Sequence, residues 1–285
     1  MSPAQLQSRR DRISSSWALA AFVCILSFNA FAEESDDVHP FIAGKFYLQL
    51  GIFSPRKDID ISFDGSLGGE NESIDFEEQL NLAATEDIFS WEFIWRFGEK
   101  WSLRTQHFKS DTQQRAVLEE DIEWGDAIIQ AGSSVETGTS LELTRVFFGW
   151  SLDSAQQVDA GVGLGFHLLD TGAFINRDII TDFGELSAVS ASGPLPNIGA
   201  WYYYSPSKSW VFGGRLDWFE ASVGDYAGGI TNVAIGANYQ FAENIGFGVN
   251  YQLFHLGADI KKSTVWRGRL ETAFQGTYFY LSGSW

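Results

Sequence analysis

The feature that constrains this chain most is an alternation of apolar and polar residues that recurs along most of its length. In residues 245–258, "IGFGVNYQLFHLGA", one set of alternate positions begins Ile, Phe, Val, Tyr, Leu and the other begins Gly, Gly, Asn, Gln. Alternate residues of a β-strand point to opposite faces of the sheet. Patterns with the helical period of 3.6 residues are almost absent. The chain is therefore expected to be all-β.

Ten alternating segments can be delimited, and short connections alternate with long ones. Short connections at 98–100, 153–157, 205–209 and 242–244 separate longer ones at 54–87, 112–136, 175–194, 224–229 and 259–269. This rhythm is typical of a transmembrane antiparallel up-and-down β-barrel with short periplasmic turns, long outer loops and both termini periplasmic. An additional hairpin over 57–65 and 72–80 would give twelve strands, which is the alternative. The ten expected strands are 45–53, 88–97, 101 to about 111, 137–152, 158–174, 195–204, 210–223, 230–241, 245–258 and 270–285.

The distribution of side chains over the two faces favours a membrane barrel over a soluble one. In residues 158–168 the apolar face is opposed by Asp159, three glycines and His167. A soluble barrel carries its apolar face inside, whereas an outer-membrane barrel carries it outside. Aromatic residues near strand ends are expected to form the girdles at the two membrane interfaces: Trp91, Trp95, Phe97, Trp101, Trp150, Trp210, Trp218, Tyr239, Phe241 and Trp285.

The N-terminal residues have the form of a secretory signal peptide. Three arginines precede an apolar run from Trp17 to Phe28, and an A-x-A site ends at Ala32. The run is shorter than the roughly 20 residues of a membrane-spanning helix. We expect cleavage after Ala32, which leaves a short periplasmic segment (33–44) and an outer-membrane barrel (45–285) in a Gram-negative bacterium.

Charge and cysteine content exclude several classes of function. The formal net charge is −18, which argues against binding to nucleic acid. Cys24 is the only cysteine and lies within the expected signal peptide, so the mature chain has no thiol chemistry. Acidic residues gather in the long connections and are expected to be solvated. Divalent cations could bridge them to surface lipopolysaccharide, although no spacing matches a defined calcium loop. We assign no metal or cofactor.

Charged residues at inward positions are the candidate functional residues. Buried charges need partners, so an internal network of salt bridges that fills the lumen is one interpretation. A polar pathway or a small ligand site is the other, because charged lumen residues tune the selectivity of a pore. The residues concerned are Glu92, Arg96, Arg104, Arg145, Asp159, His167, Arg215 and Asp217.

No catalytic site is expected. His167 and Asp170 suggest part of a hydrolase triad, but residues three apart on a strand face opposite sides. The candidate nucleophiles Ser187, Ser190 and Ser192 lie outside any motif. The stretch "GVGLGF" from Gly161 lacks both the spacing and the helix of a phosphate-binding loop. Its glycines are expected to allow close packing of a neighbour.

The segments "DIFSWEFIWRFGEKWSLRTQHFKSDTQQ", "VDAGVGLGFHLLD", "GPLPNIGAWYYYSPSKSWVFGGRLDWF" and "NIGFGVNYQLF" resemble a group of Gram-negative outer-membrane β-barrel proteins. The resemblance extends from about Lys45 to Trp285 and implies a barrel fold and an outer-membrane location. It supplies no catalytic residues. More distantly the chain is similar to OmpW-like small barrels, which implies passage of small solutes, but no diagnostic OmpW motif is present.

The last ten residues, "GTYFYLSGSW", resemble the C-terminal strand of such barrels. Phe279, Leu281 and Trp285 share one face, and the resemblance implies that the barrel-assembly machinery reads them. Gly283 departs from the pattern at one position.

Three functions are therefore carried forward, in this order: a narrow channel for small solutes, a closed structural or surface-interaction barrel with acidic outer loops, and an outer-membrane hydrolase or protease. A monomer in contact with outer-membrane lipid and lipopolysaccharide is expected.

Overall fold

The computed structural model describes residues 38–63, 73–75, 85–124, 127–153, 157–177, 189–223, 226–260 and 268–285. The expected signal peptide (1–32), the first residues of the segment 33–44 and Ser187 lie outside these ranges, as do most of the acidic residues between 64 and 84.

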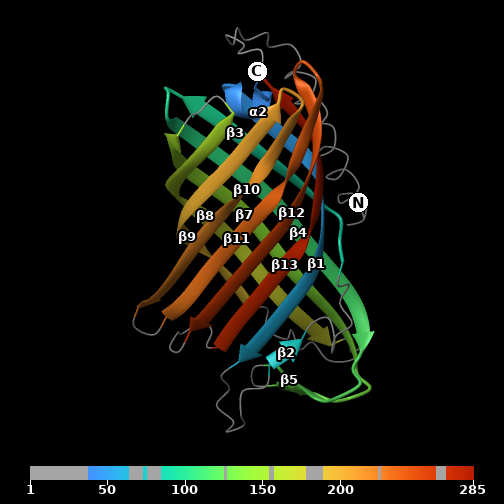
Figure 1. Ribbon diagram of the computed structural model, residues 1–285. Helices are drawn as coiled ribbons and strands as arrows, with labels where there is room; N and C mark the ends of the chain where they lie inside the picture. The colour runs from blue at the N-terminus through green and yellow to red at the C-terminus, as the bar shows by residue number, and fades with distance from the viewer. Residues whose placement is uncertain are drawn as a thin grey trace, which may run out of the picture.

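Ten antiparallel strands form a closed barrel, as the alternation predicts (Figure 1). Successive barrel strands pair with one another, and β13 pairs with β1 to close the ring. The strands are β1 (Phe46–Phe63), β3 (Ile88–Phe97), β4 (Trp101–Val117), β7 (Ser134–Asp153), β8 (Val158–Arg177), β9 (Val189–Ser207), β10 (Trp210–Val223), β11 (Tyr226–Ala242), β12 (Ile245–Ile260) and β13 (Gly268–Ser284).

The alternative count of twelve is wrong. Residues 57–63 continue β1 instead of starting a hairpin, because they remain paired with β13. The short β2 (Ser73–Asp75) pairs only with the end of β1, at residues 60–62. Strands β5 (Ile122–Trp124) and β6 (Ala127–Ile129) form a separate two-stranded sheet.

The two ends of the barrel differ. Phe46 and Trp285 exchange backbone hydrogen bonds at 2.8 and 3.1 Å, at the end that also carries the short turns. The short helix α2 (Pro40–Ala43) lies at this same end, and β2 and β5 lie at the other (Figure 1). We name these the turn end and the loop end. Among the described residues no helix is long and apolar enough to cross a membrane.

Most strands are longer than expected. The alternation continues toward the loop end, but there the inward residues become apolar and the outward residues become polar. On β12, Gly248 and Gln252 face inward, but so do Phe254 and Leu256 nearer the loop end. His255, between them, is exposed on the outer face. On β4, Lys109 and Asp111 are likewise outward while Phe108 is buried.

The expected polar lumen is therefore correct only for the turn-end half. There the outer face is an apolar belt and the interior is polar. In the loop-end half the outer face is mainly polar and the interior mainly apolar, apart from Lys57 and several buried Ser and Thr side chains, which is close to the arrangement of a soluble barrel. The belt includes Ile52, Phe89, Trp95, Trp101, Phe148, Trp150, Val162, Leu164, Phe166, Ile198, Trp210, Phe212, Leu216, Ile235, Phe241, Phe247, Val249, Tyr251, Phe279 and Leu281, each at least 38% exposed.

Candidate functional site: the barrel lumen

Seven of the eight charged residues expected in the lumen are buried, and Arg96 is half-buried. They lie in the turn-end half, in a region that we call the polar chamber. Two clusters account for seven of the eight, all but Glu92, and each places one aspartate between two arginines.

The first cluster is centred on Asp159 of β8. Its Oδ2 accepts hydrogen bonds from Arg96 and from Arg104, each at 3.1 Å. The other oxygen, Oδ1, accepts from the indole Nε1 of Trp201 at 2.7 Å and from the Ser151 hydroxyl at 3.3 Å. The Arg104 guanidinium lies 4.0 Å from the centre of the Trp201 ring. Both oxygens of the Asp159 carboxylate therefore accept charge-assisted hydrogen bonds.

The second cluster is centred on Asp217 of β10. Arg145 donates to both of its oxygens, from Nε at 2.5 Å and from Nη2 at 2.8 Å. Arg215 donates to Oδ2 at 3.3 Å. His167 Nε2 lies 3.8 Å from the same oxygen, and its other close contact is Asn232 at 3.3 Å. Arg145 and Asp217 are each about 1% exposed.

Hydrogen bonds run across the lumen between strands that are not neighbours. Gln106 of β4 accepts from Arg215 of β10 at 2.5 Å and donates to Gln252 of β12 at 3.3 Å. One side chain therefore links three parts of the wall. These hydrogen bonds across the lumen support the interpretation that the charged residues form a network that fills it.

Glu92 is 4% exposed, and none of the ion pairs among the described residues includes it. It borders a cavity of about 20 Å³ that Gln49, Arg215 and Asn238 also line. A space of this size accommodates a single water molecule. Several buried polar atoms have no protein partner in the described part of the chain, among them Arg104 Nη1, Arg145 Nη1 and His167 Nδ1. Isolated waters are the expected partners of such atoms.

Two glycines create the space that Trp201 occupies. A Cβ atom at Gly161 would lie 2.3 Å from the Trp201 ring, and one at Gly149 would lie 2.6 Å from it. The stretch that begins at Gly161 is therefore structural, as expected, because its glycine admits the indole that binds Asp159.

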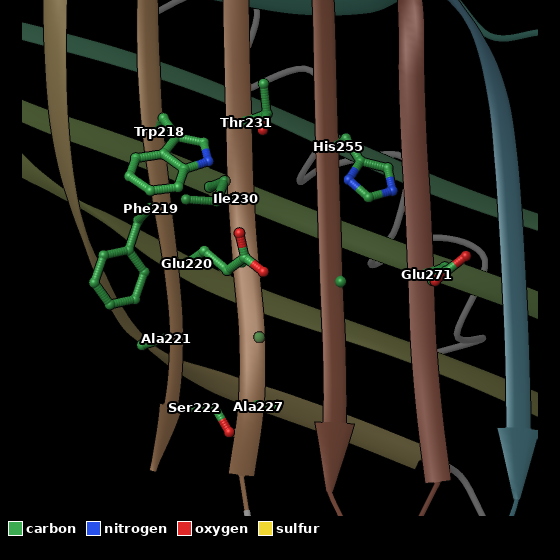
Figure 2. A pocket seen from close by; sticks show the side chains of 13 residues that line it. Trp218, Phe219, Glu220, Ala221, Ser222, Ala227, Ile230, Thr231, His255 and Glu271 are labelled. Carbon is green, nitrogen blue, oxygen red and sulfur yellow. The ribbon is translucent and has the colours of Figure 1, made fainter.

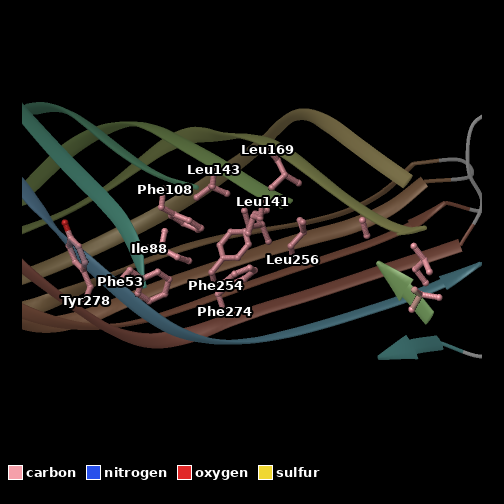
Figure 3. Packing of buried hydrophobic residues seen from close by; sticks show 14 of the residues in the cluster. Phe53, Ile88, Phe108, Leu141, Leu143, Leu169, Phe254, Leu256, Phe274 and Tyr278 are labelled. Carbon is pink, nitrogen blue, oxygen red and sulfur yellow. The ribbon is translucent and has the colours of Figure 1, made fainter. Parts of the chain in front are cut away.

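A contiguous apolar cluster, to which all ten barrel strands contribute, lies on the loop-end side of the polar chamber (Figure 3). Phe108 of β4 packs edge to face against Phe53 of β1, with ring centres 5.9 Å apart, and against Phe254 of β12, at 6.2 Å. Because β4 and β12 are separated by three strands in the sheet, this contact spans the lumen. The alternation expected for a membrane barrel did not indicate this cluster.

The turn end is closed by the chain's own N-terminal residues, here called the cork (38–43). Phe41 inserts between Tyr47 and Tyr203, with ring centres 4.7 and 4.5 Å apart. The His39 amide donates to the Ser205 hydroxyl at 2.9 Å, and His39 is fully buried. Burial lowers the pKa of His39 from 6.5 to about 4, while the Asn238 amide acts in the opposite direction. The segment 33–44 was expected only as a short periplasmic stretch, so this closure was not anticipated.

A third polar group lies in the loop-end half and was also missed from the sequence. The ammonium of Lys57 forms an ion pair with Glu86 at 2.6 Å and donates to Ser110 at 3.2 Å and to Thr112. Burial alone would raise the pKa of Glu86, but hydrogen bonds and charge from Lys57, with the Ser110 and Thr112 hydroxyls, hold it below its usual value.

His167 and Asp170 face opposite sides of β8, as their spacing predicts. His167 is fully buried in the chamber, whereas Asp170 is exposed on the outer face. Among the described residues there is no group of three or more His, Cys, Asp or Glu side chains that could hold a metal ion.

The three residues of the C-terminal pattern lie on the outer face. Phe279 and Leu281 are 60% and 48% exposed, and Trp285 stacks on Phe46 with ring centres 5.7 Å apart. Their part in assembly stays a prediction.

No family model and no curated protein matches this chain. Solved structures do match. The outer membrane protease OmpT of Escherichia coli aligns with a TM-score of 0.53 and 11% identity, over 90% of this chain and all of the protease. The toluene transporter TodX of Pseudomonas putida (11% identity, 86% and 91% coverage) and the translocator domain of the Neisseria meningitidis autotransporter NalP (12%, 97% and 95%) give TM-scores of 0.35 and 0.40. The similarity to OmpT establishes an outer-membrane type of barrel fold.

Proposed function

We propose that the protein is a closed outer-membrane barrel of a Gram-negative bacterium whose loop-end half stands beyond the membrane as a rigid surface-interaction element. It is exported with a signal peptide cleaved after Ala32, and its loop end faces outward. The observation that carries the proposal is the reversal of the interior from polar to apolar, at the level where the outer face turns from apolar to polar.

Strand length supports this arrangement. A membrane-spanning strand needs about 9–11 residues, and β7 and β8 have 20 each. The apolar belt accounts for roughly the turn-end half of each, which is the last half of β7 and the first half of β8. A second half with a polar exterior and an apolar interior is stable in water for the same reason as a soluble barrel.

Three closures in series favour a sealed barrel over a channel: the cork, the polar chamber and the apolar cluster. An apolar constriction excludes ions because water does not fill it. A narrow channel for small solutes is the second candidate, and the unpaired polar atoms of the chamber favour it because they call for water. An enzyme ranks third, because His167 and Asp170 lie on opposite faces of the wall.

The surface role can be tested by deleting residues 118–133, the connection between β4 and β7, and replacing them by a short Gly-Ser linker. The deletion is expected to leave the barrel folded and to change envelope integrity, measured as entry of a large antibiotic into cells. A matched replacement of the turn 243–244 by Gly-Ser is the control. Unchanged integrity with a folded deletion protein would contradict the surface role and leave closure unaffected.

A further inference from the structure

The outer wall has a groove of about 600 Å³ over β10 to β13 (Figure 2). Its residues belong to neither the chamber nor the cork. Trp218 stands at one edge and is 47% exposed. Glu220 projects from β10 over β11, and Glu271 stands on the far side, on β13 (Figure 2). An aromatic ring and two carboxylates therefore border the groove.

Strand register gives the distance between the two glutamates. Glu220 pairs with Gly229, Gly229 with Gly257, and Gly257 with Glu271. Three strand spacings place the backbones of the glutamates about 14 Å apart. This separation is too great for one metal ion or one ammonium group to contact both carboxylates. A ligand that uses both must carry two separate cationic groups.

The two glycines between the glutamates form a floor without side chains. A Cβ atom at Gly257 would meet nothing within 4 Å, so the space above this part of the floor is open. A thin chain can therefore cross β11 and β12 from one carboxylate to the other. Thr231 and His255 are paired in the next row toward the turn end and offer a hydroxyl and an imidazole beside this path.

Both glutamates are accessible to a ligand from water. They lie beyond the row of Leu216, Val233 and Leu253, at which the apolar belt ends on these strands. Both are exposed, and no described residue forms an ion pair with either of them. A soluble ligand can therefore reach the groove without entering the membrane.

The chemistry of the groove selects for positive charge. Ionised carboxylates only accept hydrogen bonds, and the exposed face of a tryptophan attracts a cation. The formal net charge of −18 adds a long-range attraction for cations. The matching ligand is therefore a thin, linear molecule with a cationic group at each end.

We propose that this groove binds a linear polyamine of the length of spermidine. The terminal nitrogens of extended spermidine are about 11 Å apart. One terminal ammonium group pairs with Glu220 and the other with Glu271, and the methylene groups between them cross the glycine floor. The side chains of the two glutamates span the few ångströms that remain between each backbone and the ligand. The inference goes beyond the proposed function and does not depend on membrane insertion, because binding is measured on the folded protein in detergent.

The test is isothermal titration calorimetry of the full-length folded protein in a neutral detergent, with spermidine and with 1,4-diaminobutane. The shorter diamine has its nitrogens about 6 Å apart and cannot reach both carboxylates. Wild type is expected to bind spermidine about twofold to fivefold more tightly, the ratio that one additional exposed ion pair provides. Because spermidine also carries a third charge, 1,8-diaminooctane, which has two charges and the length of spermidine, is titrated as well and is expected to show the same preference over the shorter diamine.

The variants separate the length preference from general attraction of cations. E220Q alone or E271Q alone is expected to remove the preference, because a single carboxylate cannot distinguish a long diamine from a short one. G257L places a side chain on the floor and is expected to remove it as well. The matched control is D170N, which removes an exposed outward carboxylate from β8 and is expected to keep the preference. Folding of every variant is checked by its heat-modifiable migration.

Three results would overturn the proposal. The first is equal affinity of wild type for the long and the short amines. The second is a length preference that survives E220Q or E271Q. The third is binding of a lysine-containing peptide at these glutamates when spermidine does not bind, which would assign the groove to a protein partner.

Discussion

Asp217 is the least exposed anion of the polar chamber, and replacing it by asparagine isolates the contribution of one charge. The carboxylate accepts two hydrogen bonds from Arg145 and one from Arg215. In D217N an amide N–H group replaces one carboxylate oxygen and faces a guanidinium donor. Two cations are then left in the lumen without their counter-ion.

Removal of one partner from a buried ion pair costs roughly 3–5 kcal/mol, and Asp217 is 1% exposed. We expect D217N to lower the free energy of unfolding by about that amount. Adding R145M to D217N removes one of the orphaned charges and is expected to recover part of the loss, about 1–2 kcal/mol.

The assay is reversible urea unfolding in lipid vesicles followed by tryptophan fluorescence, with D170N as the exposed control, expected within about 0.5 kcal/mol of wild type. A loss below about 1 kcal/mol for D217N would mean that water solvates the chamber charges. It would refute the reasoning that the network fills the lumen.

Three further predictions concern the cork, the glycine packing and the last strand. As pH falls from 6.5 toward 4, His39 takes up a proton when the cork is released but not when the cork is docked in the barrel. Docking of the cork is therefore most stable above pH 6.5 and weakens below it, by on the order of 3 kcal/mol at most. Amide exchange of residues 41–43 measures this, and equal protection at pH 4.5 and 7.5 would contradict it. G161A drives a methyl group into Trp201 and is expected to cost about 1–3 kcal/mol of unfolding free energy, whereas G193A, with open space around its Cβ, is the neutral control. Deletion of Trp285 removes a ring stacked on Phe46 and two backbone hydrogen bonds at the closure of the barrel, so outer-membrane insertion in cells is expected to fall; normal assembly would contradict its role as a signal.

The sequence predicted the ring of ten strands and the inward set of charges, because both follow from a period of two residues. The sequence did not predict which aspartate forms an ion pair with which arginine. Arg145 and Asp217 are on β7 and β10, and contacts across a lumen depend on barrel curvature and strand stagger, which a linear pattern does not contain.

The reversal of the faces left a signal in the sequence. In "YQLFHLGA", within the expected strand 245–258, two apolar residues adjoin at Leu253 and Phe254, where the apolar set changes sides. On β4 the outward charges Lys109 and Asp111 were read as the end of the strand, at about residue 111. The cork could not be foreseen, because Phe41 has no periodic neighbours before β1 and its burial depends on Tyr47 and Tyr203, which are far from each other in the sequence.

Conductance of the refolded full-length protein in planar bilayers tests the central claim, that the lumen is sealed. A sealed lumen predicts no conductance above background for wild type, with folding confirmed in the same preparation. It also predicts a measurable rise for F108S/F254S, which places hydroxyl groups at the two rings that meet across the lumen. Regular single-channel openings of the wild-type protein would contradict the account.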